Sequence, residues 1–386
     1  MKSFKYNVKC CLKRIIMFFL QKLNGIDKEK IVFCSFGGTQ YSDSGKAISE
    51  TFHQLYPRYK LVWLLNKIGY EDIYSVIPNY VIKKLKTTFT YLKEISTAKV
   101  VISNENFTSE FYKSKKQLFI QTWHGDRGFK KIIYDIDPLN RKVLYDVFDN
   151  KIVDLAIAGS KFGSDVYRTA FRYFGNVLNE GMPRNDILIN PNKNMANLIK
   201  SRLNISDEKV LLYAPTFRDN NQNIQKININ FNKILNTLQK DGSKWILLLR
   251  AHTASSGVKV VVDDDRAIDV TNYPDMADLL SITDFLITDY SSSACDFSLT
   301  NKPVILYTYD YAEYKNECRD FKADPHEVGF VFADNENELI KILNNTMPQQ
   351  YIDSCKRVNK YYGVSESGQS SIKVCNFIIK WLEDNK

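Results

Sequence analysis

The sequence is poor in the residues that build the commonest compact sites. It has seven cysteines among 386 residues, and none of them forms a C-x-x-C pair. Cys10 and Cys11 are the only close pair, which argues against a disulfide framework and against a zinc site. Reduced thiols in a cytoplasmic protein fit this pattern best. With only four histidines in the chain, each one is a distinct candidate for acid–base chemistry.

Several functional signatures are also absent. The chain contains no Walker motif, no G-x-G-x-x-G loop and no nucleophile elbow. It shows no zinc-finger, helix-turn-helix or RNA-binding pattern, so no nucleic-acid partner is expected. The apolar run IIMFFL near the N-terminus is too short to cross a bilayer, which takes about 20 apolar residues. The residues after that run make a poor signal-peptide cleavage site.

Size and charge describe a folded protein with an anionic partner. A chain of 386 residues favours two domains of ordinary size. Hydrophobic residues make up 44% and charged residues 25%, which is typical of a globular protein. The net charge of +9 suits a nucleotide, a phosphate polymer or an acidic membrane surface, and does not choose among them.

The N-terminal segment, residues 1–26, has the pattern of a basic amphipathic helix. Its first 24 residues hold six lysines and arginines and no acidic residue. One interpretation is a helix lying on an anionic membrane surface. The other is a helix packed on its own domain with a solvated basic face. Apolar residues recur at spacings of three and four, beside a basic stripe of lysines: Phe4, Val8, Cys11, Leu12, Ile15, Phe19 and Leu23, and Lys2, Lys5, Lys9 and Lys13.

The body of the chain alternates short apolar runs with helical patterns. Such runs predict buried strands of parallel sheets that are covered on both faces. We therefore predict two doubly wound, Rossmann-like α/β domains, residues 27–180 and 181–386, the second closed by C-terminal helices. The predicted strands are 31–36, 61–65, 99–103, 118–122 and 154–159, and then 210–215, 245–250, 267–271, 285–288 and 303–309.

Polar clusters follow several of these strands directly. His124, Thr216, Arg250 and Asp289 each stand at or just beyond the end of an apolar run. In open α/β sheets, ligands bind at the carboxyl ends of the strands. These side chains are therefore expected at the functional edges of the two sheets.

The stretch TDYSSSACDF is the clearest anion-binding pattern. Ser291, Ser292 and Ser293 follow a buried strand and open a helical pattern, so backbone N–H groups and hydroxyls would face a phosphate. The alternative is ordinary helix capping, which needs a single serine. Arg250 and His252 form a second candidate phosphate clamp. The three acids Asp263–Asp265 could suggest a divalent metal, but a solvated loop explains them better.

Taken together, the motifs resemble the CDP-glycerol glycerophosphotransferases of teichoic acid and capsule synthesis. The resemblance runs from about Ile31 to Phe332. It is carried, in the family's order, by FGGTQYSDSGKAISE, QTWHG, GMPRND, LLYAPTFRD, LLRAH, YPDMADLLSITDFLITDYSSSACDF and KPVILYTYDYAEYKNECRDF.

The resemblance implies a fold of the glycosyltransferase B type, in which two domains face a cleft, with peripheral attachment to the cytoplasmic face of the membrane. The donor would be CDP-glycerol or CDP-ribitol, and the acceptor a lipid-linked or polymeric glycan. CMP would be released, with neither metal nor cofactor. His124 would be the general base, and His252 would act at the donor phosphates. The donor-binding residues would be Gly125, Asp126, Arg127, Gly128, Arg184, Thr216, Phe217, Arg250, Ala251, Ser291, Ser292 and Asp296.

The sequence departs from the family pattern at two places. Asp126 and Arg127 stand where Thr-Pro usually follows Trp-His-Gly, and Thr253 replaces a usual proline. We expect the first change, beside the base, to mark a subfamily with a different acceptor or alditol. Two other functions remain open: a nucleotide-sugar-dependent glycosyltransferase on the same scaffold, and a membrane-surface scaffold protein without turnover.

Overall fold

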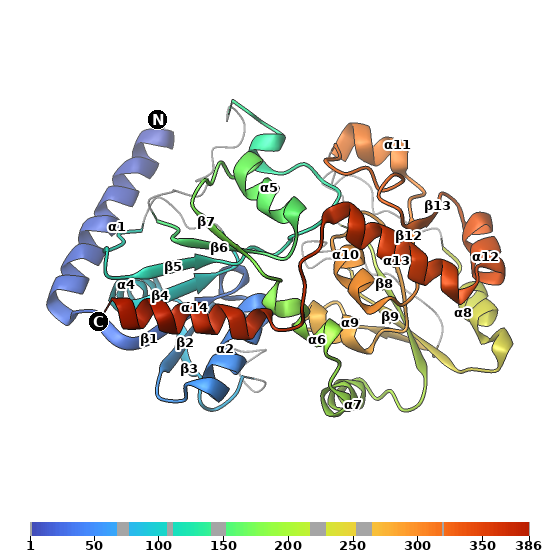
Figure 1. Ribbon diagram of the computed structural model, residues 1–386, viewed down its shortest axis with the longest axis horizontal. Helices are drawn as coiled ribbons and strands as arrows, with labels where there is room; N and C mark the ends of the chain where they lie inside the picture. The colour runs from blue at the N-terminus through green and yellow to red at the C-terminus, as the bar shows by residue number, and fades with distance from the viewer. Residues whose placement is uncertain are drawn as a thin grey trace. The chain divides into compact units, whose positions relative to one another are not determined.

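The structure is a computed structural model that describes residues 2–67, 77–105, 111–139, 152–216, 229–251, 265–318 and 320–385. The chain forms two compact units, which are described separately (Figure 1). Unit 1 comprises Met1–Asp126, Ile133–Asp186 and Ser365–Lys386. Unit 2 comprises Arg127–Ile132 and Ile187–Val364.

Unit 1 is built on a parallel sheet with the strand order β3-β2-β1-β4-β5-β6-β7. Its central strands are buried runs of valine, isoleucine, leucine and phenylalanine, as expected for a parallel sheet covered on both faces. The strands are β1 (Asp27–Cys34), β2 (Lys60–Leu65), β3 (Ile82–Leu85), β4 (Ala98–Ser103), β5 (Leu118–Gln121), β6 (Leu155–Ala158) and β7 (Asn176–Asn179).

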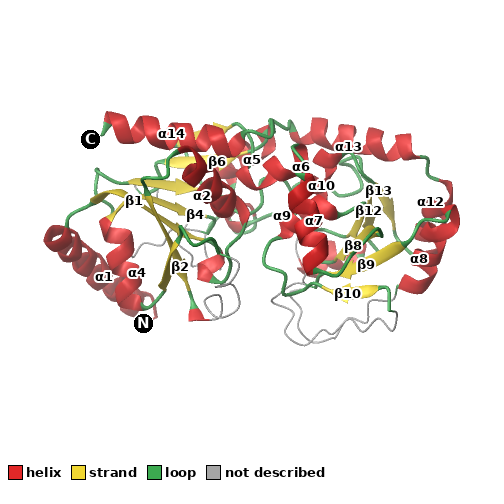
Figure 2. Ribbon diagram, turned by 90° about the horizontal axis from the view of Figure 1, so that it is seen from below, coloured by secondary structure: helices red, strands yellow, loops and turns green. Residues whose placement is uncertain are grey.

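Helices cover both faces of this sheet. Figure 2 shows α14 (Ser370–Asp384) and α2 (Asp43–Leu55) on one side, and α1 (Lys2–Asn24) and α4 (Thr88–Thr97) on the other. Ile48 and Phe52 of α2 share one core with Ile378 of α14. The unit also contains η1 (Phe36–Gly38), η2 (Ile133–Asp135), α5 (Lys161–Thr169) and η3 (Pro183–Asn185).

Unit 2 contains a parallel sheet with the order β10-β9-β8-β11-β12-β13. The strands are β8 (Lys209–Ala214), β9 (Trp245–Leu249), β10 (Ala267–Asp269), β11 (Phe285–Thr288), β12 (Val304–Tyr307) and β13 (Val331–Ala333). Helix α8 packs with α12, and α7 packs with α9. The helical segments are α6 (Asp186–Ile189), α7 (Lys193–Arg202), α8 (Phe231–Leu238), η4 (Gln239–Asp241), α9 (Met276–Ile282), α10 (Ser293–Phe297), η5 (Ser298–Thr300), α11 (Tyr311–Glu313), η6 (Tyr314–Cys318), α12 (Glu336–Asn345) and α13 (Pro348–Tyr362).

The predicted fold class, two doubly wound parallel-sheet domains, is confirmed. Each apolar run expected to be a strand overlaps one. The sequence pattern missed β3, β7 and β13, which lie at sheet edges. An edge strand has one neighbour and is buried less, so its sequence lacks the continuous apolar run that marks a central strand. In β3, for example, all four residues are exposed or half-buried.

The division into units differs from the predicted boundary near Gly181. The C-terminal helix α14 belongs to unit 1, because its apolar face completes the core beside α2. Glu366 holds the segment before α14 in place, since its carboxylate accepts hydrogen bonds from Met182 N (2.9 Å) and Asn185 Nδ2 (2.7 Å). A helix from the far end of the chain therefore closes the N-terminal unit, which a linear pattern cannot reveal.

Helix α1 confirms the predicted N-terminal helix, and one of its faces is buried while another is exposed. Met17 is fully buried and Cys10 nearly so, and the helix packs against α4. The predicted apolar stripe lies elsewhere on the helix and is exposed to solvent: Val8, Leu12, Ile15, Phe19 and Leu23. In the described part of the chain, no helix combines the length and apolarity that a membrane crossing requires.

Gly38 marks a close approach of the turn after β1 to the end of β2. Its φ of +91° lies in the left-handed region, and its carbonyl accepts a hydrogen bond from Asn66 N (2.9 Å). A Cβ at this position would lie 2.7 Å from the carbonyl oxygen of Leu64 and 2.8 Å from Asn66 N. Both neighbours are backbone atoms that cannot swing away, so only glycine fits.

We expect Gly38→Ala to lower the free energy of unfolding of unit 1 by about 2–4 kcal/mol, because it combines a left-handed φ with a backbone clash. Gly25→Ala is the matched control, since Gly25 also has a positive φ of 71°, but beyond its chain neighbours no atom of the described residues lies within 4 Å of an added Cβ. The control should lose about 1–2 kcal/mol. Urea unfolding followed by tryptophan fluorescence measures both losses, and equal losses would contradict the packing argument.

Candidate active site

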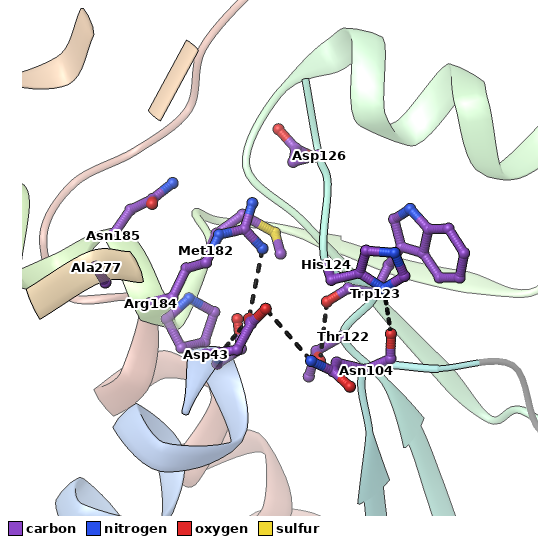
Figure 3. A network of polar contacts seen from close by, with 12 residues as sticks. Asp43, Asn104, Thr122, Trp123, His124, Asp126, Met182, Arg184, Asn185 and Ala277 are labelled. Atoms are coloured by element: carbon purple, nitrogen blue, oxygen red, sulfur yellow. Dashed lines mark hydrogen bonds and ion pairs between the residues drawn. The ribbon is translucent and has the colours of Figure 1, made fainter. Parts of the chain in front are cut away.

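The candidate site in unit 1 lies at the carboxyl edge of its sheet. Strands β1, β4 and β5 are neighbours and run parallel, so the loops that follow them meet at one edge. These loops carry Phe36, Asn104 and His124. Figure 3 shows Asn104 and His124 side by side, with Asp43 of α2 and Arg184 of η3 next to them.

His124 is exposed, and one of its ring nitrogens is tethered. Its Nδ1 lies 2.8 Å from the backbone carbonyl oxygen of Asn104. A carbonyl oxygen can only accept a hydrogen bond, so Nδ1 carries the hydrogen. In the neutral ring this leaves the lone pair on Nε2. His124 thus has the form of a proton acceptor whose ring orientation is fixed.

Two aromatic rings and a strained backbone also hold this histidine. The indole of Trp123 lies 4.0 Å from the imidazole between ring centroids, and the ring of Phe36 lies 5.5 Å away. Trp123 has a φ of +51°, which costs a non-glycine residue about 1–2 kcal/mol. The backbone N–H of Trp123 donates a hydrogen bond to Gln121 Oε1 at 2.8 Å, which holds the turn in this conformation. Such strain is commonly found at functional sites.

Asn104 and Asp43 form a buried polar network behind the histidine. The Asn104 side chain accepts from Phe36 N (2.9 Å) and donates to Asp43 Oδ2 (3.3 Å). Asp43 Oδ1 lies 3.5 Å from Arg184 Nη1, and Asp43 and Arg184 are each 8% exposed. From the sequence, Arg184 is expected in the site, whereas Asn104 is not named and Asp43 is covered only through the stretch FGGTQYSDSGKAISE, without a role. Asn104 directly follows the predicted strand 99–103, so the rule that selected His124 could have found it.

Asp126 and Arg127, the departures from the family pattern, both have partners within the protein. The carboxylate of Asp126 accepts from Gly159 N at 2.9 Å, and Figure 3 shows it pointing away from His124. Asp126 is also packed against Gly163, where a Cβ would lie 1.8 Å from its Oδ1. In unit 2, the guanidinium of Arg127 is fully buried and donates to Asp296 Oδ1 at 3.0 Å.

A second polar edge lies in unit 2, where β9, β8 and β11 are neighbours. Thr216, Arg250 and Asp289 follow these strands. Asp289 Oδ1 accepts from Thr216 N (2.8 Å) and Tyr290 N (2.6 Å), which ties the ends of β8 and β11 together. Arg250 N donates to the Tyr213 carbonyl at 2.9 Å. The structure therefore brings these three predicted residues together at one sheet edge.

The Arg250 side chain is a cation held at this edge. Its Nη1 is buried and has no hydrogen-bond partner among the residues that the structure describes. Burial lowers the pKa of the guanidinium, and the nearby Asp275 raises it. Because the ordinary pKa of arginine lies above about 12, the group stays charged at neutral pH. The next residue, Ala251, donates its N–H to Thr271 Oγ1 at 3.1 Å.

The serine loop lies at the start of the short helix α10. Ser291 Oγ accepts from Ser293 N (3.3 Å) and from Ser293 Oγ (2.9 Å). Ser292 stands at the N-cap, but its side chain makes no capping hydrogen bond. Both Ser291 and Ser292 are half-buried. Gly128 lies near this loop, because a Cβ there would be 3.5 Å from Ser292 Cβ.

Three predicted features lie outside the described residues in whole or in part. They are the second family histidine, His252, the candidate nucleotide contact Phe217, and the acidic run, of which only Asp265 is described. Of the remaining predicted residues, Gly125 is half-buried in unit 1, and the Gly128 carbonyl accepts from Tyr362 Oη at 3.2 Å in unit 2.

Comparison with known structures supports the fold. The wall teichoic acid polymerase TagF is similar over 99% of this chain and 96% of its own, with a TM-score of 0.83 and 28% sequence identity. The UDP-GlcNAc 2-epimerase from Neisseria meningitidis, solved with UDP-GlcNAc bound, covers 91% of this chain and 100% of its own, with a TM-score of 0.54. At 13% identity, that second likeness concerns the fold alone.

Comparison with known sequences agrees with the motif resemblance. A teichoic acid glycerol-phosphate transferase of Staphylococcus aureus is 32% identical over 371 residues, covering 92% of this chain and 94% of that protein. The family model for CDP-glycerol:poly(glycerophosphate) glycerophosphotransferases matches residues 16–380. With a match over nearly the whole chain and the motif residues at the ends of the expected strands, this protein belongs to the CDP-glycerol:poly(glycerophosphate) glycerophosphotransferase family.

Proposed function

We propose that the protein transfers glycerol phosphate from CDP-glycerol to a hydroxyl of a teichoic acid or related cell-surface glycan, or of its lipid-linked precursor, and releases CMP. The observation that carries this proposal is the exposed, tethered imidazole of His124 in a chain of the glycerophosphotransferase family. An imidazole held in this way can act as a general base through its free Nε2 lone pair. The similarity to the Staphylococcus aureus teichoic acid glycerol-phosphate transferase supports glycerol as the alditol.

In the proposed reaction, His124 Nε2 takes the proton of the acceptor hydroxyl. The acceptor oxygen forms a bond to the phosphorus that carries glycerol, and the bond from that phosphorus to the bridging oxygen breaks. CMP leaves with the bridging oxygen and its electron pair. Negative charge therefore grows on the departing phosphate, where fixed cations and hydrogen-bond donors lower the barrier.

We assign the donor contacts mainly to the polar edge of unit 2. Arg250 is the cation suited to the pyrophosphate, because its Nη1 is buried without a hydrogen-bond partner in the described chain. Ser291 and Ser292 offer hydroxyls, and Thr216 and Ala251 lie at the same edge. The family resemblance also assigns donor binding to Phe217, His252, Gly125, Gly128 and Arg184.

We assign a different role to Asp126, Arg127 and Asp296. Their charged groups are engaged with protein partners, so we propose that they hold the loop after His124 and do not contact the donor. The family's general base would then be flanked here by two anchors. This reading leaves the alditol and the acceptor to be fixed by other residues.

A donor panel tests the proposed reaction. We expect purified protein, given a glycan acceptor that ends in glycerol phosphate, to release CMP from CDP-glycerol faster than from CDP-ribitol, and to release no UDP from UDP-sugars. Chromatography of the nucleotide products measures this, with the acceptor omitted as the control. Release of UDP alone would establish the glycosyltransferase alternative, and no release from any donor would favour a scaffold protein.

We expect His124→Ala to lower kcat by at least about a hundredfold, the usual effect of losing a general base, while CDP-glycerol still binds. His53→Ala is the matched control, because His53 also lies in unit 1 but stacks on Tyr80, with 3.6 Å between ring centroids. The control should keep its turnover. Wild-type turnover of His124→Ala would remove this residue from the mechanism.

We further propose peripheral attachment to the cytoplasmic face of the membrane through helix α1. The support is an exposed apolar stripe on a segment with six basic and no acidic residues. Apolar side chains can enter the headgroup region while lysines contact anionic lipids. The opposite face of α1 packs on α4, so the helix is fixed to unit 1 while its stripe is free.

We expect the double substitution Leu12→Ser with Phe19→Ser to reduce binding to vesicles rich in anionic lipid by about tenfold or more, since each change removes apolar surface from the contact. Both side chains are more than half exposed, at 56% and 58%, so the fold should be unaffected. Leu198→Ser with Met347→Ser, two exposed apolar residues of unit 2, is the control. Equal loss of sedimentation with vesicles in both variants would contradict a specific role for α1.

A further inference from the structure

We propose that Asn104 and Asp43 are positioning residues that fix the imidazole of His124 in one tautomer and one orientation. This inference rests on the proposed function, in which His124 is the base. It adds two residues to which sequence reasoning gave no role, and it assigns them a physical task. Neither is proposed to touch the substrate.

The first step concerns the ring. The neutral histidine side chain in water favours the tautomer with hydrogen on Nε2, which would place the lone pair on the wrong nitrogen for a base facing solvent. The Asn104 carbonyl, 2.8 Å from Nδ1, can bind only the tautomer with hydrogen on Nδ1. The hydrogen bond therefore selects the form in which Nε2 is ready to accept a proton.

The second step concerns the carbonyl. A backbone carbonyl in a loop fixes a ring only if the loop itself is fixed. Asn104 is 1% exposed, and both ends of its amide are held. Its oxygen accepts from Phe36 N, in the turn after β1, and its nitrogen donates to Asp43 on α2. The side chain thus anchors its own backbone to two different elements of unit 1.

The third step concerns Asp43. This residue adopts a φ of +62°, which is unfavourable for a side chain with a Cβ, and its carboxylate is nearly buried. It occupies the first turn of α2 but is directed toward Asn104 and Arg184 (Figure 3). When His124 becomes an imidazolium during the transfer, a nearby carboxylate lowers the energy of that cation. The ion pair with Arg184 holds the carboxylate in place.

The tautomer is tested directly by long-range ¹H–¹⁵N correlation NMR on the full-length protein with ¹⁵N-labelled histidine and no donor present. The chain has only four histidines, and the His124→Ala spectrum identifies the signal of His124. We expect the wild-type protein to carry the hydrogen on Nδ1. A signal typical of hydrogen on Nε2 would overturn the proposal, whatever the activity of the enzyme.

The kinetic test uses Asn104→Ala and Asp43→Asn. We expect Asn104→Ala to lower kcat about 10- to 100-fold, the usual scale for a misplaced catalytic group, with KM for CDP-glycerol changed less than about twofold. In the same variant the NMR signal should become a mixture of tautomers. Asp43→Asn keeps the shape of the side chain and removes its charge, so it should lower kcat without changing the tautomer.

The controls are Asn179→Ala and Asp186→Asn, which each remove comparable hydrogen bonds in unit 1 away from His124. Unchanged kcat in Asn104→Ala, or an equal fall in the controls, would overturn the positioning role. The two proposals fail separately. An active His124→Ala variant contradicts the role of His124 as the base. If that variant is inactive but the wild-type protein carries the hydrogen on Nε2, only the positioning role is contradicted. The tautomer of His124 is measured in the wild-type protein, so this test holds even if Asn104 variants fold poorly.

Discussion

The parallel alignment of β1, β4 and β5 is the constraint on which the rest of the site depends. Parallel neighbours place their carboxyl ends at the same edge, so residues far apart in sequence are brought within hydrogen-bonding distance. Phe36, Asn104 and His124 meet for this reason alone. Once they meet, three hydrogen bonds define which nitrogen of His124 is basic: the ring donates one to the Asn104 carbonyl, and the Asn104 side chain accepts one from Phe36 N and donates one to Asp43.

Much of the fold and part of the site could be predicted from the sequence, and there is a physical reason why the rest could not. Central strands such as 210–215 can be recognised in the sequence because burial on both faces requires unbroken apolar runs. The same runs point to the polar residues beyond them, as with Arg250 and Asp289. Edge strands such as β3 give no such signal. Asp43 lies within the family stretch FGGTQYSDSGKAISE, but its role could not be read from it, because its partner Asn104 is 61 positions away.

The loop after the histidine shows how geometry changes the meaning of a motif. In the sequence, Asp126 and Arg127 are candidates for a role in substrate binding, since they are charged residues beside the proposed base. In the structure, each is buried against a partner, Asp126 in unit 1 and Arg127 in unit 2. The chain passes from one unit to the other between these two residues. Each of the two charges therefore has a protein partner on its own side of that crossing.

Helix α14 has a consequence for how the protein is made. Its residues complete the core of unit 1 beside Ile48 and Phe52, yet they are synthesised after all of unit 2. On the ribosome, the part of the unit 1 core that α14 fills therefore remains open while the rest of unit 2 emerges. Unit 2 can fold during synthesis as chains usually do, domain by domain. Unit 1 cannot complete its core until α14, which is translated after unit 2, has emerged.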